Sequence, residues 1–73
     1  MARGVVIFHT SSAAIRSEKI LLKSGLAVKL IPTPREFSSD CGIALRFDWD
    51  QEVNVRRLLE TAGVDIAAIR RFQ

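Results

Sequence analysis

The feature that most constrains the fold is a pattern that occurs twice: an extended apolar stretch, a helical stretch ended by glycine, and a further extended stretch. In the first half, residues 4–10 (GVVIFHT) are apolar and β-branched, which predicts a strand buried on both faces. Residues 11–25 (SSAAIRSEKILLKSG) predict an amphipathic helix, with Ser11 or Ser12 as its N-terminal cap. Residues 27–32 (AVKLIP) predict a second strand, ended by a proline that has no N–H to donate.

The second half repeats this order. Residues 43–48 (IALRFD) alternate between apolar and other side chains, which predicts a half-buried antiparallel strand. Residues 48–63 (DWDQEVNVRRLLETAG) predict a second helix, for which Asp48 or Asp50 is the expected cap. Residues 64–72 (VDIAAIRRF) supply a last strand.

Elements in the order βαββαβ leave few topologies open. Because crossovers between parallel strands are right-handed, the order predicts a ferredoxin-like α+β two-layer sandwich, with an antiparallel sheet in the order 4-1-3-2 and both helices on one face. The first and second strands then run parallel, so the loop after the second strand lies at the sheet end where the first helix begins. We therefore expect residues 32–42 beside residues 9–12, with the turn at residues 63–65 at the same edge.

Length and composition fit one small domain over residues 1–73. A chain of 73 residues removes roughly 60% of its unfolded surface from water on folding, which suffices for a two-layer fold. No apolar run approaches the roughly 18 residues of a membrane-spanning helix, and the first ten residues contain no small-residue cleavage site. We expect a soluble, cytoplasmic protein.

The counts of cysteine, histidine and charged residues exclude several functions. One cysteine cannot form an internal disulfide. One cysteine with one histidine cannot complete a four-ligand metal site without carboxylates or a second chain, so no metal or cofactor is expected. A formal charge of +3 is weak support for nucleic-acid binding, which is not expected. With no hydrolase motif or glycine-rich phosphate loop, a stand-alone enzyme is not expected either. The arginine pairs at 56–57 and 70–71 are typical of solvated faces, although together they could hold an anion.

The loop PTPREFSSDCG (residues 32–42) is the candidate functional segment. Residues 33–36 (TPRE) have the form of a capping box, with Pro34 pre-set for the first helical position, so we expect a short helical turn there. Gly42 is expected to permit a backbone geometry that other residues resist. The alternative is that the loop is only a rigid connector.

Cys41 has two interpretations. A lone cysteine is more often buried and inert, but this one follows two serines and an aspartate and precedes a glycine, which is not the composition of a core strand. A free thiol is only about 3% ionised at pH 7, so a reactive one needs stabilisation of its thiolate. Arg35, His9 and the N-terminus of the first helix could supply it, and Asp40 would oppose them.

Four serines complete the candidate site. Ser38 and Ser39 precede the cysteine and could donate hydrogen bonds to an anion on the sulfur, and the backbone N–H groups at the start of the first helix, where Ser11 and Ser12 lie, could stabilise it. If Cys41 is functional, its sulfur should be at least partly accessible to solvent. For His9, the more ordinary role is a strand-end residue bonded to the backbone.

The stretches IPTPREFSSDCGIALRF, SSAAIRSEKILLKSG and LLETAGV resemble the selenium/sulfur (Se/S) carrier protein-like family over nearly the whole chain. The Pro-Arg-Glu stretch followed by Ser and Cys-Gly is the most specific part. The resemblance implies a bacterial or archaeal cytoplasmic protein whose cysteine, here Cys41, carries sulfur or selenium.

Two hypotheses follow. In the first, the chain is a non-enzymatic carrier that holds the chalcogen as a persulfide or selenopersulfide on Cys41, with donor and acceptor proteins as partners. In the second, it is a small ligand-binding or regulatory module with no thiol chemistry, for which Arg46 on the open sheet face is a candidate. In either case the open sheet face could form a homodimer.

Overall fold

The structure is a computed structural model that describes residues 2–37 and 41–72. Its four strands are β1 (Arg3–Ile7), β2 (Val28–Pro32), β3 (Ile43–Asp48) and β4 (Ala68–Phe72). The helices are α1 (Ser11–Lys23) and α2 (Glu52–Thr61), with short 3-10 helices η1 (Arg35–Phe37) and η2 (Trp49–Gln51). The last strand is shorter than the sequence predicts, because the chain pairs with β1 only from residue 68 onward.

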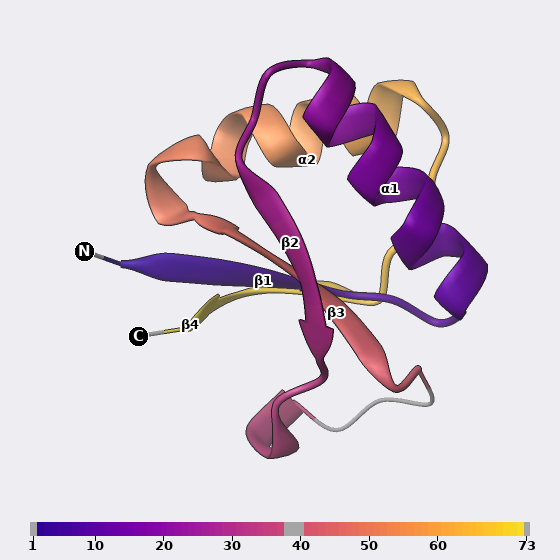
Figure 1. The fold of residues 1–73 in the computed structure, drawn as a ribbon, viewed down its shortest axis with the longest axis vertical. Coiled ribbons are helices and arrows are strands. Elements are labelled where there is room, and N and C mark those ends of the chain that lie inside the picture. The colour runs from indigo at the N-terminus through magenta and orange to yellow at the C-terminus, as the bar shows by residue number, and fades with distance from the viewer. Residues whose placement is uncertain (1, 38–40, 73) are drawn as a thin grey trace.

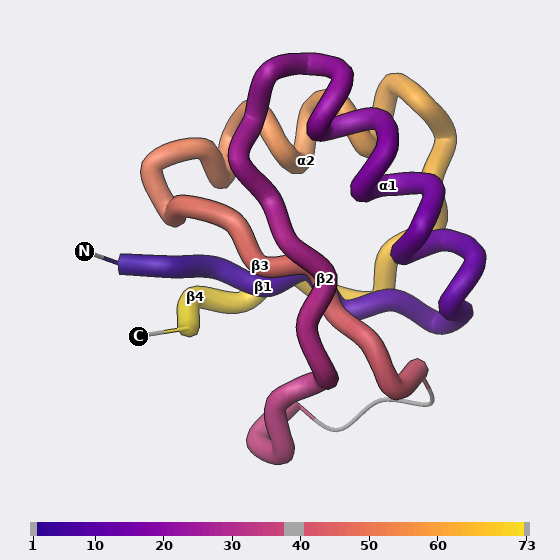
Figure 2. Tube along the Cα trace, viewed as in Figure 1, coloured from indigo at the N-terminus to yellow at the C-terminus, as the bar shows by residue number. Residues whose placement is uncertain are grey.

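The strands form one antiparallel sheet in the order β2-β3-β1-β4, which confirms the predicted ferredoxin-like topology. Both helices cover the same face of the sheet, as predicted (Figure 1). Arg3 lies opposite both Asp48 and Phe72, so the two ends of the chain lie at one end of the sheet (Figure 2). At the other end, Pro32 pairs with Ile43, and η1 follows β2.

The first helix is capped by Thr10, and the prediction of Ser11 or Ser12 as the cap is wrong. Thr10 has extended backbone angles, and its hydroxyl accepts a hydrogen bond of 3.2 Å from the backbone N–H of Ala13. The predicted stop at Gly25 is confirmed, since this residue has φ of 87° and its N–H donates to Leu22.

The second helix has no carboxylate cap, so the prediction of Asp48 or Asp50 is also wrong. Asp48 precedes η2 and Asp50 lies inside it, so the extra turn moves the start of α2 to Glu52. The N-terminal residue that flanks α2 is Gln51, whose side-chain oxygen accepts from Asn54 at 2.8 Å.

The core has two parts, one on each face of the sheet. The larger lies between the sheet and the helices and includes Leu21, Leu45 and Leu59. The smaller lies on the opposite face and consists of Val5, Ile7 and Ala44, packed against partly buried Ile31, Phe37, Ala68 and Phe72. The prediction that β1 is buried on both faces is therefore confirmed.

Within the described residues, neither helix has the length and apolarity needed to cross a lipid bilayer.

Candidate functional site

Cys41 lies at the end of the sheet where β1 and β2 finish, two residues before β3 begins. Its sulfur is 3.8 Å from the hydroxyl oxygen of Ser11, the first residue of α1. The expectation that the loop after β2 lies beside the start of α1 is thus confirmed at Cys41. The connection from α2 to β4 lies at the same end, because the N–H of Ala67 donates to the carbonyl of Ile7 at 2.7 Å.

The thiol itself is buried. Cys41 is only 3% exposed and belongs to the core cluster on the helix-covered face. Its Sγ donates a hydrogen bond of 3.2 Å to the carbonyl oxygen of Ile43, which is an arrangement for a neutral S–H group. The expectation of a partly accessible sulfur is therefore wrong.

The burial follows from an extension of the β2–β3 hairpin beyond its last regular pair. The N–H of Thr33 donates to the carbonyl of Gly42 at 3.1 Å, and the Thr33 hydroxyl donates to the carbonyl of Cys41 at 2.9 Å. Side chains alternate along a strand, so Cys41 falls on the same face as Ile43 and Leu45, toward the helices. The sequence did contain a signal for this burial. If the alternation of residues 43–48 is extended two residues toward the N-terminus, Cys41 falls on the same apolar face as Ile43 and Leu45.

The residues around the loop turn depart in part from the capping-box prediction. The predicted short helical turn is confirmed as η1, in which the N–H of Phe37 donates to the carbonyl of Pro34 at 3.0 Å. The Thr33 hydroxyl, however, is engaged by the carbonyl of Cys41. Arg35 is exposed, and its side chain forms no hydrogen bond or ion pair with another residue that the structure describes.

The remaining candidates divide into two groups. Ser11 contacts the sulfur, whereas the hydroxyl of Ser12 lies 3.3 Å from that of Thr10. The exposed side chain of His9 makes no hydrogen bond or ion pair within the described part of the chain. Ser38, Ser39 and Asp40 lie outside the described residues.

Gly42 does not have the predicted special geometry. The positive φ angles among the described glycines belong to Gly25 and Gly63. Gly42 is exposed, and a Cβ atom placed on it would meet nothing within 4 Å. A side chain is therefore compatible with this position, and glycine is not required there by the backbone.

The site is a thiol that is shielded from solvent and lies near the start of a helix. The N-terminal end of α1 carries a partial positive charge, which favours an anion at that point. Against this, the carbonyl of Ile43 faces the sulfur and matches the protonated form. No group of three or more His, Cys, Asp or Glu residues suited to a metal ion occurs among residues 2–37 and 41–72.

Arg56 and Arg70, one from each arginine pair, do not lie together. Arg56 on α2 is engaged in a salt bridge of 2.9 Å with Glu52. Arg70 lies opposite Val5 on β1, on the sheet face away from the helices. Arg56 and Arg70 therefore lie on different surfaces, and Arg71, opposite Gly4, alternates to the face toward the helices.

Comparison with known proteins gives one family. A family model described as "Putative Se/S carrier protein-like" matches residues 3–71. An uncharacterized protein of Methanocaldococcus jannaschii is 30% identical over 62 residues, which covers 85% of this chain and 31% of that protein. The chain thus spans about a third of the length of this curated relative. No solved structure matches the sequence. Because the family model covers nearly the whole sequence, the chain belongs to the Se/S carrier protein-like family.

Proposed function

We propose that this member of the Se/S carrier protein-like family holds a sulfur or selenium atom on Cys41 and passes it from a donor protein to an acceptor protein. The observation that supports this most is the position of the thiol, 3.8 Å from the hydroxyl of Ser11 at the start of α1. An anionic persulfide at that point would lie at the positive end of the helix dipole, with a hydroxyl able to donate to it.

The loading step requires no external oxidant. The thiolate of Cys41 attacks the outer sulfur of a persulfide on the donor, an S–S bond forms at Cys41, and the donor's own S–S bond breaks. The donor leaves as a thiolate, and the proton of the Cys41 thiol goes to solvent. In the selenium case, a selenium atom occupies the place of the transferred sulfur.

Discharge needs a second molecule. This chain has one cysteine and therefore no internal thiol that could release the transferred atom. An acceptor thiol attacks the outer atom and returns Cys41 to its thiolate. We infer a carrier without catalytic activity of its own, working in a reducing cytoplasm where the thiol stays free.

The burial of the sulfur adds a requirement to this proposal. A donor can reach Cys41 only if the start of α1 and the β2–β3 hairpin separate locally, and such partial openings cost less than global unfolding. The isolated protein should therefore react slowly with small alkylating agents. Binding of a donor that favours the open form would increase the rate.

A second candidate function is supported by the same burial. If Cys41 serves only as a small apolar side chain in the core, the chain is a binding module without thiol chemistry. Its contacts with the core cluster and its hydrogen bond to Ile43 are what this alternative expects. The two functions differ in what the sulfur carries in the cell.

Intact-mass measurement of the protein taken directly from its native cell distinguishes them. The carrier should show a fraction heavier by one sulfur or one selenium atom, which a reductant removes and which is absent from Cys41→Ser. A thiol that is unmodified both in growing cells and after incubation with a persulfide donor would contradict the carrier proposal and support the module.

A homodimer through the sheet face away from the helices stays a prediction. Phe37 and Phe72 cover part of that face, with ring centroids 6.1 Å apart. A second copy would have to pack against these rings. Sedimentation equilibrium over a range of concentrations would detect the dimer.

A further inference from the structure

The sheet face away from the helices carries a row of cations at the end opposite to Cys41. Lys29 on β2 lies opposite Arg46 on β3, and Arg46 lies opposite Val5 on β1. Arg3 is two residues before Val5 on β1, so its side chain projects from the same face. Three positive side chains from three neighbouring strands therefore share one small surface.

Among the described residues, no carboxylate neutralises these charges by an ion pair. Asp48 is the registered partner of Arg3, yet within the described residues no salt bridge joins any of the three cations to a carboxylate. Like charges directly opposite on neighbouring strands destabilise a sheet, so the pairing of Lys29 with Arg46 has an energetic cost. That cost falls when an anion binds between the two side chains.

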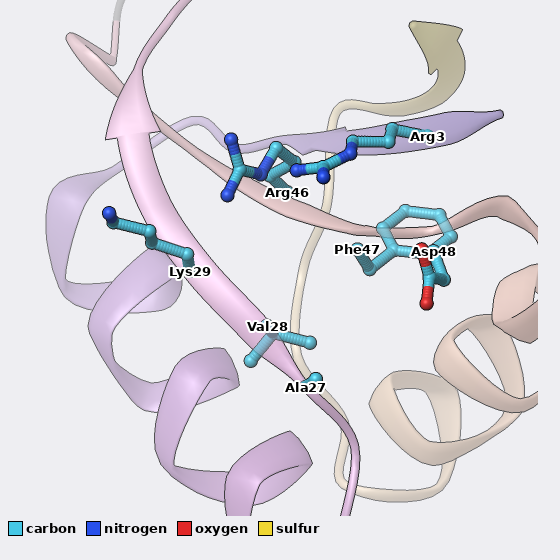
Figure 3. A pocket seen from close by; sticks show the side chains of 7 residues that line it. All are labelled: Arg3, Ala27, Val28, Lys29, Arg46, Phe47 and Asp48. Atoms are coloured by element: carbon cyan, nitrogen blue, oxygen red, sulfur yellow. The ribbon is translucent and has the colours of Figure 1, made fainter. Parts of the chain in front are cut away.

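A pocket of about 300 Å³ lies at this point, and its lining consists of the three cations with Asp48, Ala27, Val28 and Phe47. Figure 3 shows the side chain of Arg3 extending toward that of Arg46, whose guanidinium group points onward, away from Arg3, while the carboxylate of Asp48 points away from both. The volume is at the lower end of the range for small-ligand sites, roughly 300–1,000 Å³. It suits a small ligand better than an extended chain.

We propose that this pocket binds the phosphate group of a small molecule. Three cations and one carboxylate give a formal charge of +2 (3 − 1), which matches the charge of about −1.5 to −2 on a phosphate monoester at neutral pH. The planar guanidinium groups of Arg3 and Arg46 can each contact two phosphate oxygens, and Lys29 adds a point charge. The proposal is independent of any chemistry at Cys41.

The test is a titration of the full chain with inorganic phosphate and, separately, with adenosine monophosphate at constant ionic strength. NMR chemical shifts of the amides and side chains report the binding. Both ligands should give saturable shifts centred on Arg3, Lys29 and Arg46, and chloride should not. A higher affinity for the nucleotide than for inorganic phosphate would show that the phosphate group belongs to a larger molecule. Equal affinities would show that the pocket recognises the phosphate group alone.

Variants connect the binding to these side chains. Arg46→Gln should weaken binding roughly tenfold, since it removes a charge-assisted bidentate contact. Arg57→Gln removes the same charge from the exposed surface of α2 and should leave the affinity unchanged. Asp48→Asn should tighten binding two- to threefold (about 0.4–0.6 kcal/mol), because it removes the nearest negative charge.

Three results would overturn the proposal. The first is equal shifts with chloride and phosphate, which would mean salt screening alone. The second is equal weakening by Arg46→Gln and Arg57→Gln when both variants keep the folded spectrum; if Arg46→Gln fails to fold, Lys29→Gln replaces it. The third is binding of a single-stranded oligonucleotide with no binding of the two small phosphates, which would identify an extended polyanion surface.

Discussion

The proposed sites at the two ends of this sheet differ in where their polar side chains lie: the thiol is buried at one end, and the cations lie at the surface at the other. At one end, the thiol of Cys41 is buried, and its S–H group is directed to the carbonyl of Ile43. At the other, Arg3, Lys29 and Arg46 extend over the open face with no salt bridge among the described residues. A buried polar group needs a partner within the protein, whereas a charge at the surface is solvated by water and stays available to a ligand.

The difference arises within a single strand and its extension. Cys41 and Arg46 are five positions apart along β3 and its hairpin, and an odd spacing places side chains on opposite faces. The face toward the helices receives the cysteine, and the face away from them receives the arginine. The four predictions below test this contrast, from the largest expected effect to the smallest.

Gly4→Ala should cause the largest loss of stability. A Cβ atom on Gly4 would come within 2.5 Å of the ring of Phe47 and 2.7 Å of that of Trp49, which stack at 6.0 Å. Overpacking of this kind typically costs 1–3 kcal/mol, and we expect about 3 kcal/mol here because Phe47 is buried and has little room to move. Urea denaturation would measure the change.

Gly42→Ala is the matched control at the thiol end. A Cβ atom there meets nothing within 4 Å and the backbone is not in the left-handed region, so stability should stay within ~0.5 kcal/mol of the parent. Similar losses for the two alanine variants would show that the packing of the two ends has been assigned incorrectly.

Phe37→Ala should lower the free energy of unfolding by about 2 kcal/mol. The ring of Phe37 belongs to η1 at the thiol end, yet it packs at 6.1 Å against Phe72, the registered partner of Arg3 at the basic end. It also packs against the smaller core cluster of Val5, Ile7 and Ala44. Thermal and urea unfolding would give the value, with Phe37→Leu as a control that retains most of the apolar contact. An unchanged free energy of unfolding in the alanine variant would mean that this ring does not bury the apolar side chains of the open face.

Cys41→Ser should lower stability by about 1 kcal/mol, since it places a hydroxyl in a site surrounded by core side chains. The same burial predicts that alkylation of the parent protein at neutral pH is at least tenfold slower than that of a cysteine in an unfolded peptide. Urea at unfolding concentrations should remove this protection. Rapid alkylation under native conditions, with no stability change in the serine variant, would instead show an exposed thiol.

Lys29→Gln should raise stability slightly, by roughly 0.2–0.5 kcal/mol, because it relieves the repulsion across the pair with Arg46. The gain should decrease as salt is added, since salt screens exposed charges. Lys19→Gln, on the exposed surface of α1, serves as the control with the same loss of charge. A loss of stability in Lys29→Gln would mean that the lysine makes a favourable contact, which would weaken the case for an anion pocket.

The sequence determined the order of elements and, through it, the topology. The apolar periods of the helices, the alternation in IALRFD and the handedness of crossovers are local or general rules, so they predicted the sheet order and the proximity of the loop to the start of α1. The family followed from the loop motif for the same reason, because a short pattern of residues carries it without reference to contacts.

Only the tertiary structure decided the exposure of Cys41, the helix caps and the grouping of the cations. The burial of Cys41 depends on hydrogen bonds from Thr33, a partner eight or nine positions away, which extend the hairpin and fix its face. The cation row depends on the register of three strands, since Arg3, Lys29 and Arg46 are widely separated in the chain. Pairing register and burial are properties of contacts between distant segments, and a sequence pattern of short range does not specify them.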